Sequence, residues 1–190
     1  MRKILFIICW ALAGVGLYSC SLDEPSYGKT TSDNYYQKES DIEQALTGAY
    51  LQLRTTWNEY ALNHYFVGDC STDDALKGGG NDGDRAEVRD LSDFTIYTTN
   101  GEVGRRWEIL YRLINRCNDV IYYAPDAIGN EELLKRYANE AKALRAFGYY
   151  CLVTTFGEVP LITTPMQPAE ILQIPRSPLE KVYECIVNDL

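Results

Sequence analysis

Apolar residues recur at steps of three and four positions along much of the chain, which is the spacing of helices with one buried face. The segments with this spacing are 41–54, 105–124, 131–156 and the stretch that follows Ser177. Ser40, with Glu43 three residues later, is the expected capping box of the first helix, and Ser177 is the expected N-cap of the last. The aromatic stretch 55–66 is expected to be helical or extended. The pattern therefore predicts a mostly all-α fold.

The two longest predicted helices are joined by a short turn with Pro125 and Gly129, residues that end helices. A short connection favours an antiparallel pair. Small residues that let the helices approach closely are Ala138, Ala141, Ala143 and Ala146. Trp107-x-x-Leu110 and Ala143-x-x-x-Phe147 together approximate half of a tetratricopeptide repeat. We therefore expect tetratricopeptide-like antiparallel helix pairs with long loops.

Tyrosine is abundant, with 15 residues in the chain of 190. Many tyrosines lie on the apolar helical stripes, as do Trp107 and Phe147. The tyrosines on the stripes include Tyr111, Tyr137, Tyr150 and Tyr183. An apolar stripe at helical spacing is usually core, so we expect these rings to be buried and only the aromatic residues near loops to be available for binding.

The first twenty residues have the pattern of an export signal. Met1-Arg2-Lys3 is cationic, and the apolar run that follows is shorter than the roughly 20 residues a transmembrane helix needs. Leu17-Tyr18-Ser19-Cys20 resembles the lipobox of bacterial lipoproteins, in which the cysteine receives a lipid. We therefore expect residues 1–19 to be the signal peptide, Cys20 the lipidated residue, 20–38 a flexible tether and 39–190 the helical domain. An ordinary secretory signal is the alternative.

Charge and histidine content exclude several classes of function. The chain has 18 Lys and Arg against 27 Asp and Glu, a formal net charge of −9. The phosphate backbone would repel such a chain, so nucleic acid is not an expected partner. His64 is the only histidine, which excludes multi-histidine metal sites and His-Glu-x-x-His chemistry. No catalytic residue, metal or cofactor is expected.

Four cysteines follow the signal and Cys20: Cys70, Cys117, Cys151 and Cys185. Four cysteines allow three pairings in an export compartment. Three of them lie inside helical patterns, where a buried free thiol behaves as a small hydrophobic side chain, so unpaired thiols are favoured over disulfides.

The segment 78–84, Gly-Gly-Gly-Asn-Asp-Gly-Asp, cannot be the interior of a helix. A Ca²⁺ loop is one interpretation, but the acidic spacing of an EF-hand is absent. No Gly-Lys-Ser/Thr follows, so a phosphate-binding loop has less support. We expect a flexible surface loop.

Four motifs together carry a family resemblance. They are Cys20-Ser21-Leu22-Asp23-Glu24-Pro25; Ser71-Thr72-Asp73-Asp74-Ala75; Trp107-x-x-Leu110-Tyr111-x-x-Ile114-x-x-x-Asn118-x-Val120-Ile121; and Glu140-Ala141-Lys142-Ala143-Leu144-Arg145-Ala146-Phe147-Gly148-Tyr149-Tyr150 with Leu152 to Leu161. The chain after the signal resembles the amino-terminal region of the SusD-like (RagB/SusD) family, the surface nutrient-binding lipoproteins of Bacteroidetes outer membranes. SusD-like proteins continue for several hundred residues more, so the resemblance implies a truncated α-helical scaffold.

The resemblance implies an outer-membrane lipoprotein, facing the cell exterior, that captures a glycan or other nutrient and passes it to a SusC-like TonB-dependent transporter. It implies no catalysed reaction. Two alternatives remain open from the residues. The helices could serve as a docking module without a ligand site of their own, and an acidic chain could be an extracytoplasmic glycoside hydrolase, although no pair of carboxylates stands out.

Sugars stack their apolar faces on aromatic rings and hydrogen-bond to polar neighbours. The expected stacking residues are Trp57, Tyr60 and Tyr97, and the expected polar partners are Asp69, Asp73, Asn81 and Asp82. The alternative for Trp57 and Tyr60 is a place in the core.

Overall fold

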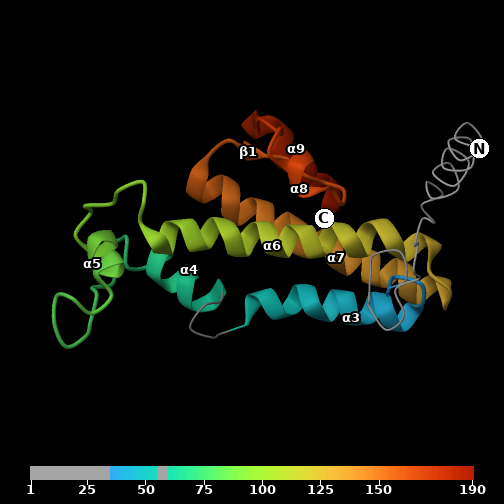
Figure 1. Cartoon of the computed structure of the whole chain (residues 1–190), viewed down its shortest axis with the longest axis horizontal. Helices are drawn as coiled ribbons and strands as arrows, with labels where there is room; N and C mark the ends of the chain where they lie inside the picture. Colours follow the sequence, from blue (N-terminus) through green and yellow to red (C-terminus); the bar gives the residue numbers. More distant parts are fainter. Residues whose placement is uncertain (1–34, 55–59) are drawn as a thin grey trace, which may run out of the picture. The chain divides into compact units, whose positions relative to one another are not determined.

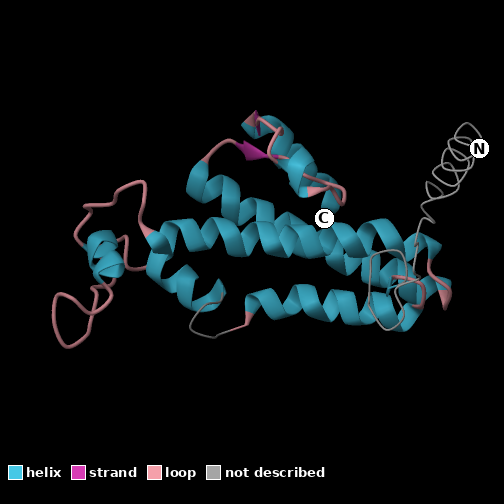
Figure 2. Ribbon diagram, viewed as in Figure 1, coloured by secondary structure: helices cyan, strands magenta, loops and turns pink. Residues whose placement is uncertain are grey.

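The structure is a computed structural model that describes residues 35–54 and 60–190. Ser32–Leu190 forms one compact unit, and its described part is mostly helical (Figures 1 and 2). Its α-helices are α3 (Glu39–Tyr50), α4 (Tyr60–Gly68), α5 (Ala86–Ser92), α6 (Gly101–Tyr123), α7 (Glu131–Phe156), α8 (Pro168–Ile171) and α9 (Leu179–Asp189). Two 3₁₀ turns, η1 (Leu51–Leu53) and η2 (Ala124–Asp126), and two short strands, β1 (Val159–Pro160) and β2 (Arg176–Ser177), complete it. The expectation of a mostly all-α fold is confirmed.

Helices α6 and α7 form the predicted antiparallel pair, joined by η2 (Figure 1). Helix α7 has the predicted bounds, because the Asn130 side chain accepts from the N–H groups of Glu132 (2.9 Å) and Leu133 (3.3 Å) and caps it. Helix α6 begins at Gly101 rather than at the predicted 105. Two glycines in its first turn hide this start from a propensity argument, whereas the Asn100 side chain caps it.

Helix α3 packs along both long helices, where Ile42, Leu46 and Ala49 are buried against α6 and α7. The predicted start of α3 was wrong by two residues. Lys38 is the N-cap, not Ser40, because the backbone of Lys38 is extended and bridged to Ile128. The Asp41 carboxylate then accepts from the Lys38 N–H at 2.9 Å. The helix ends at Tyr50, and η1 continues the chain to Leu53.

A second core region lies between α6, α7, β1 and α9, with Tyr149 fully buried in it. The sequence stripe had favoured other rings: Phe147 (39% exposed), Tyr150 (53%), Tyr183 (43%) and Trp107 (36%) lie at the surface, whereas Tyr137 is buried as expected. Helix α7 contacts α3, α6 and α9, so its buried surface is wider than a single stripe and includes Tyr149. Tyr149 donates its hydroxyl to the Ile162 carbonyl and accepts from the Ile162 N–H, both at 2.7 Å.

A buried arginine joins α7 to α6, α9 and the segment after β1. The Arg145 guanidinium binds both carboxylate oxygens of Asp189 at 2.7 Å. It also donates to the Asn118 side chain and to the Thr163 carbonyl, each at 2.9 Å. Asn118 in turn donates to the Ile162 carbonyl at 2.9 Å. Each of these buried polar groups therefore has a partner, as a buried charge requires.

The segment 157–178 contains the two short strands and α8. Gly157, at φ 73°, ends α7 in a conformation that glycine adopts easily. The strands β1 and β2 then pair in antiparallel register, Val159 with Ser177 and Pro160 with Arg176. Ser177 therefore lies in a strand, and the residue that precedes α9 as its N-cap is Pro178.

The four described cysteines are free thiols, which confirms the preference for unpaired cysteines. Burial raises the pKa of Cys117 to about 12, so this thiol stays protonated at neutral pH. No helix in the described ranges is both long enough and apolar enough to cross a membrane.

The ion pair of Arg145 and Asp189 gives a stability prediction. Asp189→Ala leaves a buried guanidinium without its carboxylate, and we expect a loss of about 3 kcal/mol of unfolding free energy, which lowers Tm by roughly 6 °C or more. A thermal melt followed by circular dichroism measures it. The matched control is Glu184→Ala on the same helix, because Glu184 pairs with Lys181 at the exposed surface. Equal melting temperatures for the two variants would contradict the assignment.

Candidate functional site

The loops around α5, residues 69–100, gather at the end of α6 that is opposite η2 (Figure 1). We call this part of the chain the loop surface. It contains five of the seven residues expected to bind ligand, and it is the part of the described chain with the most loop. Its usefulness as a binding site depends on whether these loops are held in place.

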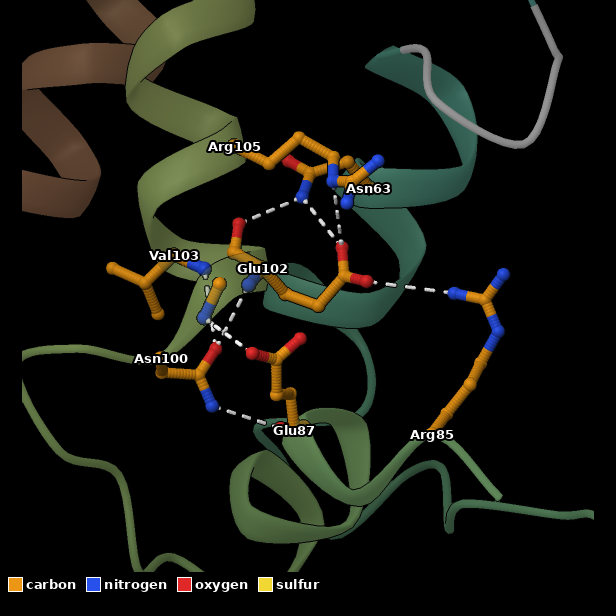
Figure 3. Close-up of polar contacts among 8 residues, drawn as sticks. Asn63, Arg85, Glu87, Asn100, Glu102, Val103 and Arg105 are labelled. Atoms are coloured by element: carbon orange, nitrogen blue, oxygen red, sulfur yellow. Dashed lines mark hydrogen bonds and ion pairs between the residues drawn. The ribbon is translucent and has the colours of Figure 1, made fainter. Parts of the chain in front are cut away.

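Asn100 and Glu87 attach the loop surface to α6 (Figure 3). The Asn100 side chain accepts from the N–H groups of Glu102 (3.0 Å) and Val103 (3.3 Å), and it donates to the Glu87 carbonyl at 2.9 Å. The Glu87 carboxylate accepts from the Gly101 N–H at 3.1 Å. Both acceptors meet backbone N–H groups that the start of a helix leaves unpaired, so α5 and the start of α6 hold each other.

Glu102 extends this network to α4 and to the loop before α5 (Figure 3). Asn63 of α4 donates to the Glu102 carbonyl at 2.8 Å and to its carboxylate at 3.2 Å. Arg85 and Arg105 lie 3.4 Å and 3.7 Å from the same carboxylate. Asn63 and Glu102 are buried, so the three segments that carry the loop surface share one anchored base.

Tyr97 is the predicted stacking residue that the structure places on this base. The Arg89 guanidinium, 2.8 Å from the Asp90 carboxylate, holds the pKa of Asp90 below its usual value. A hydrogen bond with Asp90 raises the pKa of the Tyr97 hydroxyl. The Tyr97 ring is nevertheless 46% exposed. The Tyr97 carbonyl accepts from the Asn100 N–H at 3.0 Å, which holds its backbone to this base, and a residue held in this way loses less conformational freedom when a ligand stacks on its ring.

Other apolar side chains are exposed on or beside the loop surface, and the sequence analysis did not select them. They are Tyr65, Leu76, Phe94 and Ile96. Phe94 is 66% exposed and has a positive φ of 56°, an unusual conformation for an aromatic residue. A hollow of about 220 Å³ is lined by Tyr65, Phe66 and Arg85, among others. The Arg85 guanidinium lies over the Phe66 ring, 4.7 Å from its centre.

The predicted ligand residues differ in where the structure places them. Asp69, Asp73, Asn81, Asp82 and Tyr97 all lie on the loop surface and are exposed. Asn81 also has a structural role, because its side chain accepts from the N–H groups of Gly83 (2.9 Å) and Asp84 (3.1 Å) and shapes the glycine-rich loop.

The remaining candidates are not placed by the structure. Tyr60 is the first residue of α4, which packs on α6, and its side chain is not described. Trp57 and the expected lipidation residue Cys20 lie outside the described residues.

A second concave region follows α6, with a volume of about 400 Å³. Trp107, Tyr111, Ile162 and Leu172 are among its lining residues. The Tyr111 hydroxyl donates to the Pro160 carbonyl at 2.7 Å, and the Trp107 ring meets Phe156 edge-on with centroids 5.1 Å apart. The expected core position is wrong for Trp107, which is a wall of this groove. The groove is mostly apolar and offers few polar partners for a hydroxyl-rich ligand.

Acid–base and metal chemistry find little support in the described chain. No group of three or more His, Cys, Asp or Glu side chains in residues 35–54 and 60–190 is placed to hold a metal ion. His64 Nδ1 lies 3.1 Å from the Arg106 guanidinium. Burial and the Arg106 charge lower the pKa of His64, so it is neutral at pH 7 and accepts a hydrogen bond from Arg106.

Known proteins resemble this chain in both sequence and fold. SusD-like protein P2 from Formosa agariphila is 30% identical over 193 residues, which cover 99% of this chain and 36% of that relative. SusD-like protein P25 from the same organism is 26% identical over 200 residues, with 99% and 37% covered. This chain therefore spans about a third of the length of these curated relatives.

Among solved structures, a laminarin-binding SusD-like protein matches with a TM-score of 0.71 at 30% identity, over 81% of this chain and 33% of that one. Surface glycan-binding protein A from Bacteroides fluxus matches with a TM-score of 0.67 at 29% identity, over 80% and 32%.

A family model covers almost the whole chain after the expected signal. Residues 21–190 match the SusD-like family described as starch-binding and associating with the outer membrane. The match includes the helices that carry the Trp107 and Glu140 motifs and the loop surface that precedes them. The chain belongs to the SusD-like family.

Proposed function

We propose that this protein binds a glycan on the loop surface and passes it to a SusC-like TonB-dependent transporter, while a lipid on Cys20 holds it at the outside of the outer membrane. SusD-like proteins are binding proteins and not enzymes, so the hydrolase alternative is dropped. The observation that carries the proposal is the exposed ring of Tyr97, whose carbonyl accepts from the Asn100 N–H of the base that joins α4, α5 and α6.

The chemistry of the loop surface suits a sugar ligand. Sugar rings present apolar C–H faces, and exposed Tyr97 and Phe94 offer flat apolar surfaces. Exposed Asp73, Asn81 and Asp82 supply acceptors, and Asn81 a donor, for hydroxyl groups. Two of the matched structures are named as laminarin-binding and surface glycan-binding proteins, which supports the same class of ligand here.

A docking role is the second candidate, and a separate surface favours it. Tyr50 of α3 and Tyr150 of α7 are exposed aromatic residues on helices that pack together. Phe147, one turn before Tyr150, is 39% exposed. Aromatic side chains are enriched at protein interfaces, and helical repeats commonly present one face to a partner. We propose that these exposed aromatic residues of α3 and α7 contact the transporter.

The first test concerns Tyr97. We expect Tyr97→Ala to weaken binding of whichever polysaccharide the protein recognises, in a panel that includes laminarin and starch, by about tenfold. Isothermal titration calorimetry measures the affinity. Tyr97→Phe is the matched control, because it keeps the ring and removes only the hydroxyl that meets Asp90. Unchanged affinity in Tyr97→Ala would show that the ligand lies elsewhere.

The second test separates binding from docking. Tyr50→Ala combined with Tyr150→Ala should lower co-purification of the neighbouring transporter barrel and leave polysaccharide affinity unchanged. Tyr97→Ala should lower polysaccharide affinity and leave co-purification of the transporter unchanged. The test uses single side-chain substitutions and not a deletion of the loops. A deletion of residues 77–100 would also remove α5 and the Asn100 cap of α6. If the Tyr50/Tyr150 variant co-purifies with the transporter as well as the wild type does, a role of these two rings in docking is rejected.

The third test concerns the anchor. In cells fed an alkyne fatty acid, the wild-type protein should take up label and fractionate with outer membranes, since buried acyl chains contribute about 0.8 kcal/mol per CH₂. Cys20→Ala should take up none. Equal labelling of the wild-type protein and Cys20→Ala would instead support the alternative, in which residues 1–19 are an ordinary secretory signal.

A further inference from the structure

The charges of the loop surface are strongly unequal. Between residues 69 and 100 the chain has acidic residues at Asp69, Asp73, Asp74, Asp82, Asp84, Glu87, Asp90 and Asp93, and basic residues only at Lys77, Arg85 and Arg89. The imbalance is larger here than the overall acidity of the chain implies. Whether a ligand experiences it depends on which charges are already paired inside the protein.

The three basic side chains each contact other groups of the protein itself. Lys77 donates its ammonium to the Asn81 carbonyl at 2.7 Å. Arg85 lies over Phe66 and 3.4 Å from the Glu102 carboxylate. Arg89 binds the Asp90 carboxylate at 2.8 Å and the Asp82 carbonyl at 2.9 Å. Each basic side chain therefore already has a carboxylate or carbonyl partner. A ligand carboxylate or sulfate would have to displace that partner to bind the basic side chain.

Most of the acidic side chains are in the opposite situation. Six of them are exposed: Asp69, Asp73, Asp74, Asp82, Asp84 and Asp93. None of the six is in a salt bridge with any described residue. Asp93 directly precedes Phe94, and Asp82 and Asp84 lie in the glycine-rich loop. The loops that carry the exposed rings thus also carry six exposed carboxylates without an ion-pair partner within 4 Å among the described residues.

We infer that the loop surface selects neutral glycans and rejects anionic ones, such as uronate-containing or sulfated polymers. The inference rests on the proposed function and specifies the ligand class of the same site. Like charges repel across about one Debye length, 8–10 Å at ordinary ionic strength, and a polyanion brings many charges into that range at once. Repulsion of this kind provides specificity by penalising the wrong ligand, without any added contact to the right one.

The test compares polymers that differ only in charge. The 190-residue chain is titrated with laminarin, starch and xylan and with the carboxymethylated form of each, in 50 mM salt with EDTA present. We expect a neutral polymer to bind and its carboxymethylated form to bind at least about tenfold more weakly, with the difference shrinking in 500 mM salt as screening increases. Equal affinity for the two forms, or a difference that salt does not change, would overturn the inference.

A charge variant tests the same inference from the protein side. Asp74→Asn with Asp93→Asn should tighten binding of the carboxymethylated polymer by about threefold and leave the neutral polymer unchanged. Glu43→Gln with Glu180→Gln is the matched control, because it changes the net charge equally at exposed positions on α3 and α9. Equal gains in both variants would assign the effect to net charge and reject a local role.

The outcomes separate this inference from the proposed function. Suppose that Tyr97→Ala loses binding of the neutral polymer, and that the wild-type protein binds the carboxymethylated form as tightly as the neutral one. This result would reject the selectivity and keep the proposed function. Absence of binding by every polymer would reject both.

Discussion

The buried ion pair of Arg145 and Asp189 is the interaction on which most of the helical framework depends. One guanidinium binds α9 through Asp189, α6 through Asn118 and the segment after β1 through the Thr163 carbonyl. A buried charge tolerates few alternative arrangements, because any that leaves it unpaired costs several kcal/mol. Arg145 therefore adds a specific polar constraint to the apolar packing that places α9 and β1 against the α6–α7 pair.

The loop surface depends on a smaller network at the other end of α6. There Asn100, Glu87 and Glu102 satisfy backbone groups and side chains of three segments. This division places rigid packing in the helices and exposed chemistry in loops that are anchored at their base. Proteins commonly carry their binding residues on loops held by a rigid scaffold. Within the loops the charges divide in the same way, since Glu87, Arg85 and Arg89 make structural contacts whereas six exposed aspartates have no ion-pair partner within 4 Å.

Periodicity predicted the long helices because each buries an apolar stripe, and α7 was placed to the residue. It failed where polar side chains decide. The start of α6 depends on the Asn100 cap, and the start of α3 depends on Asp41 and Lys38. Tyr149 is buried and Tyr150 is exposed because α7 has neighbouring helices on several sides. For the candidate site, the five expected residues that lie on the loop surface are exposed, and their binding role stays a prediction. The exposure of Phe94 and Tyr65 was not foreseen, because nothing in the local sequence shows that their rings lie at the surface.

The sequence by itself determined the family, the mostly helical architecture and the absence of multi-histidine metal sites, because each depends on residue type and spacing along the chain; lipidation at Cys20 stays a prediction. Only the tertiary structure decided that Arg145 is buried and paired, that the Tyr97 ring is exposed beside the Asn100 base, and that the basic residues of the loop surface have partners while six aspartates have no ion pair within 4 Å. Those properties depend on which groups meet across distant parts of the chain, and spacing alone does not encode such meetings.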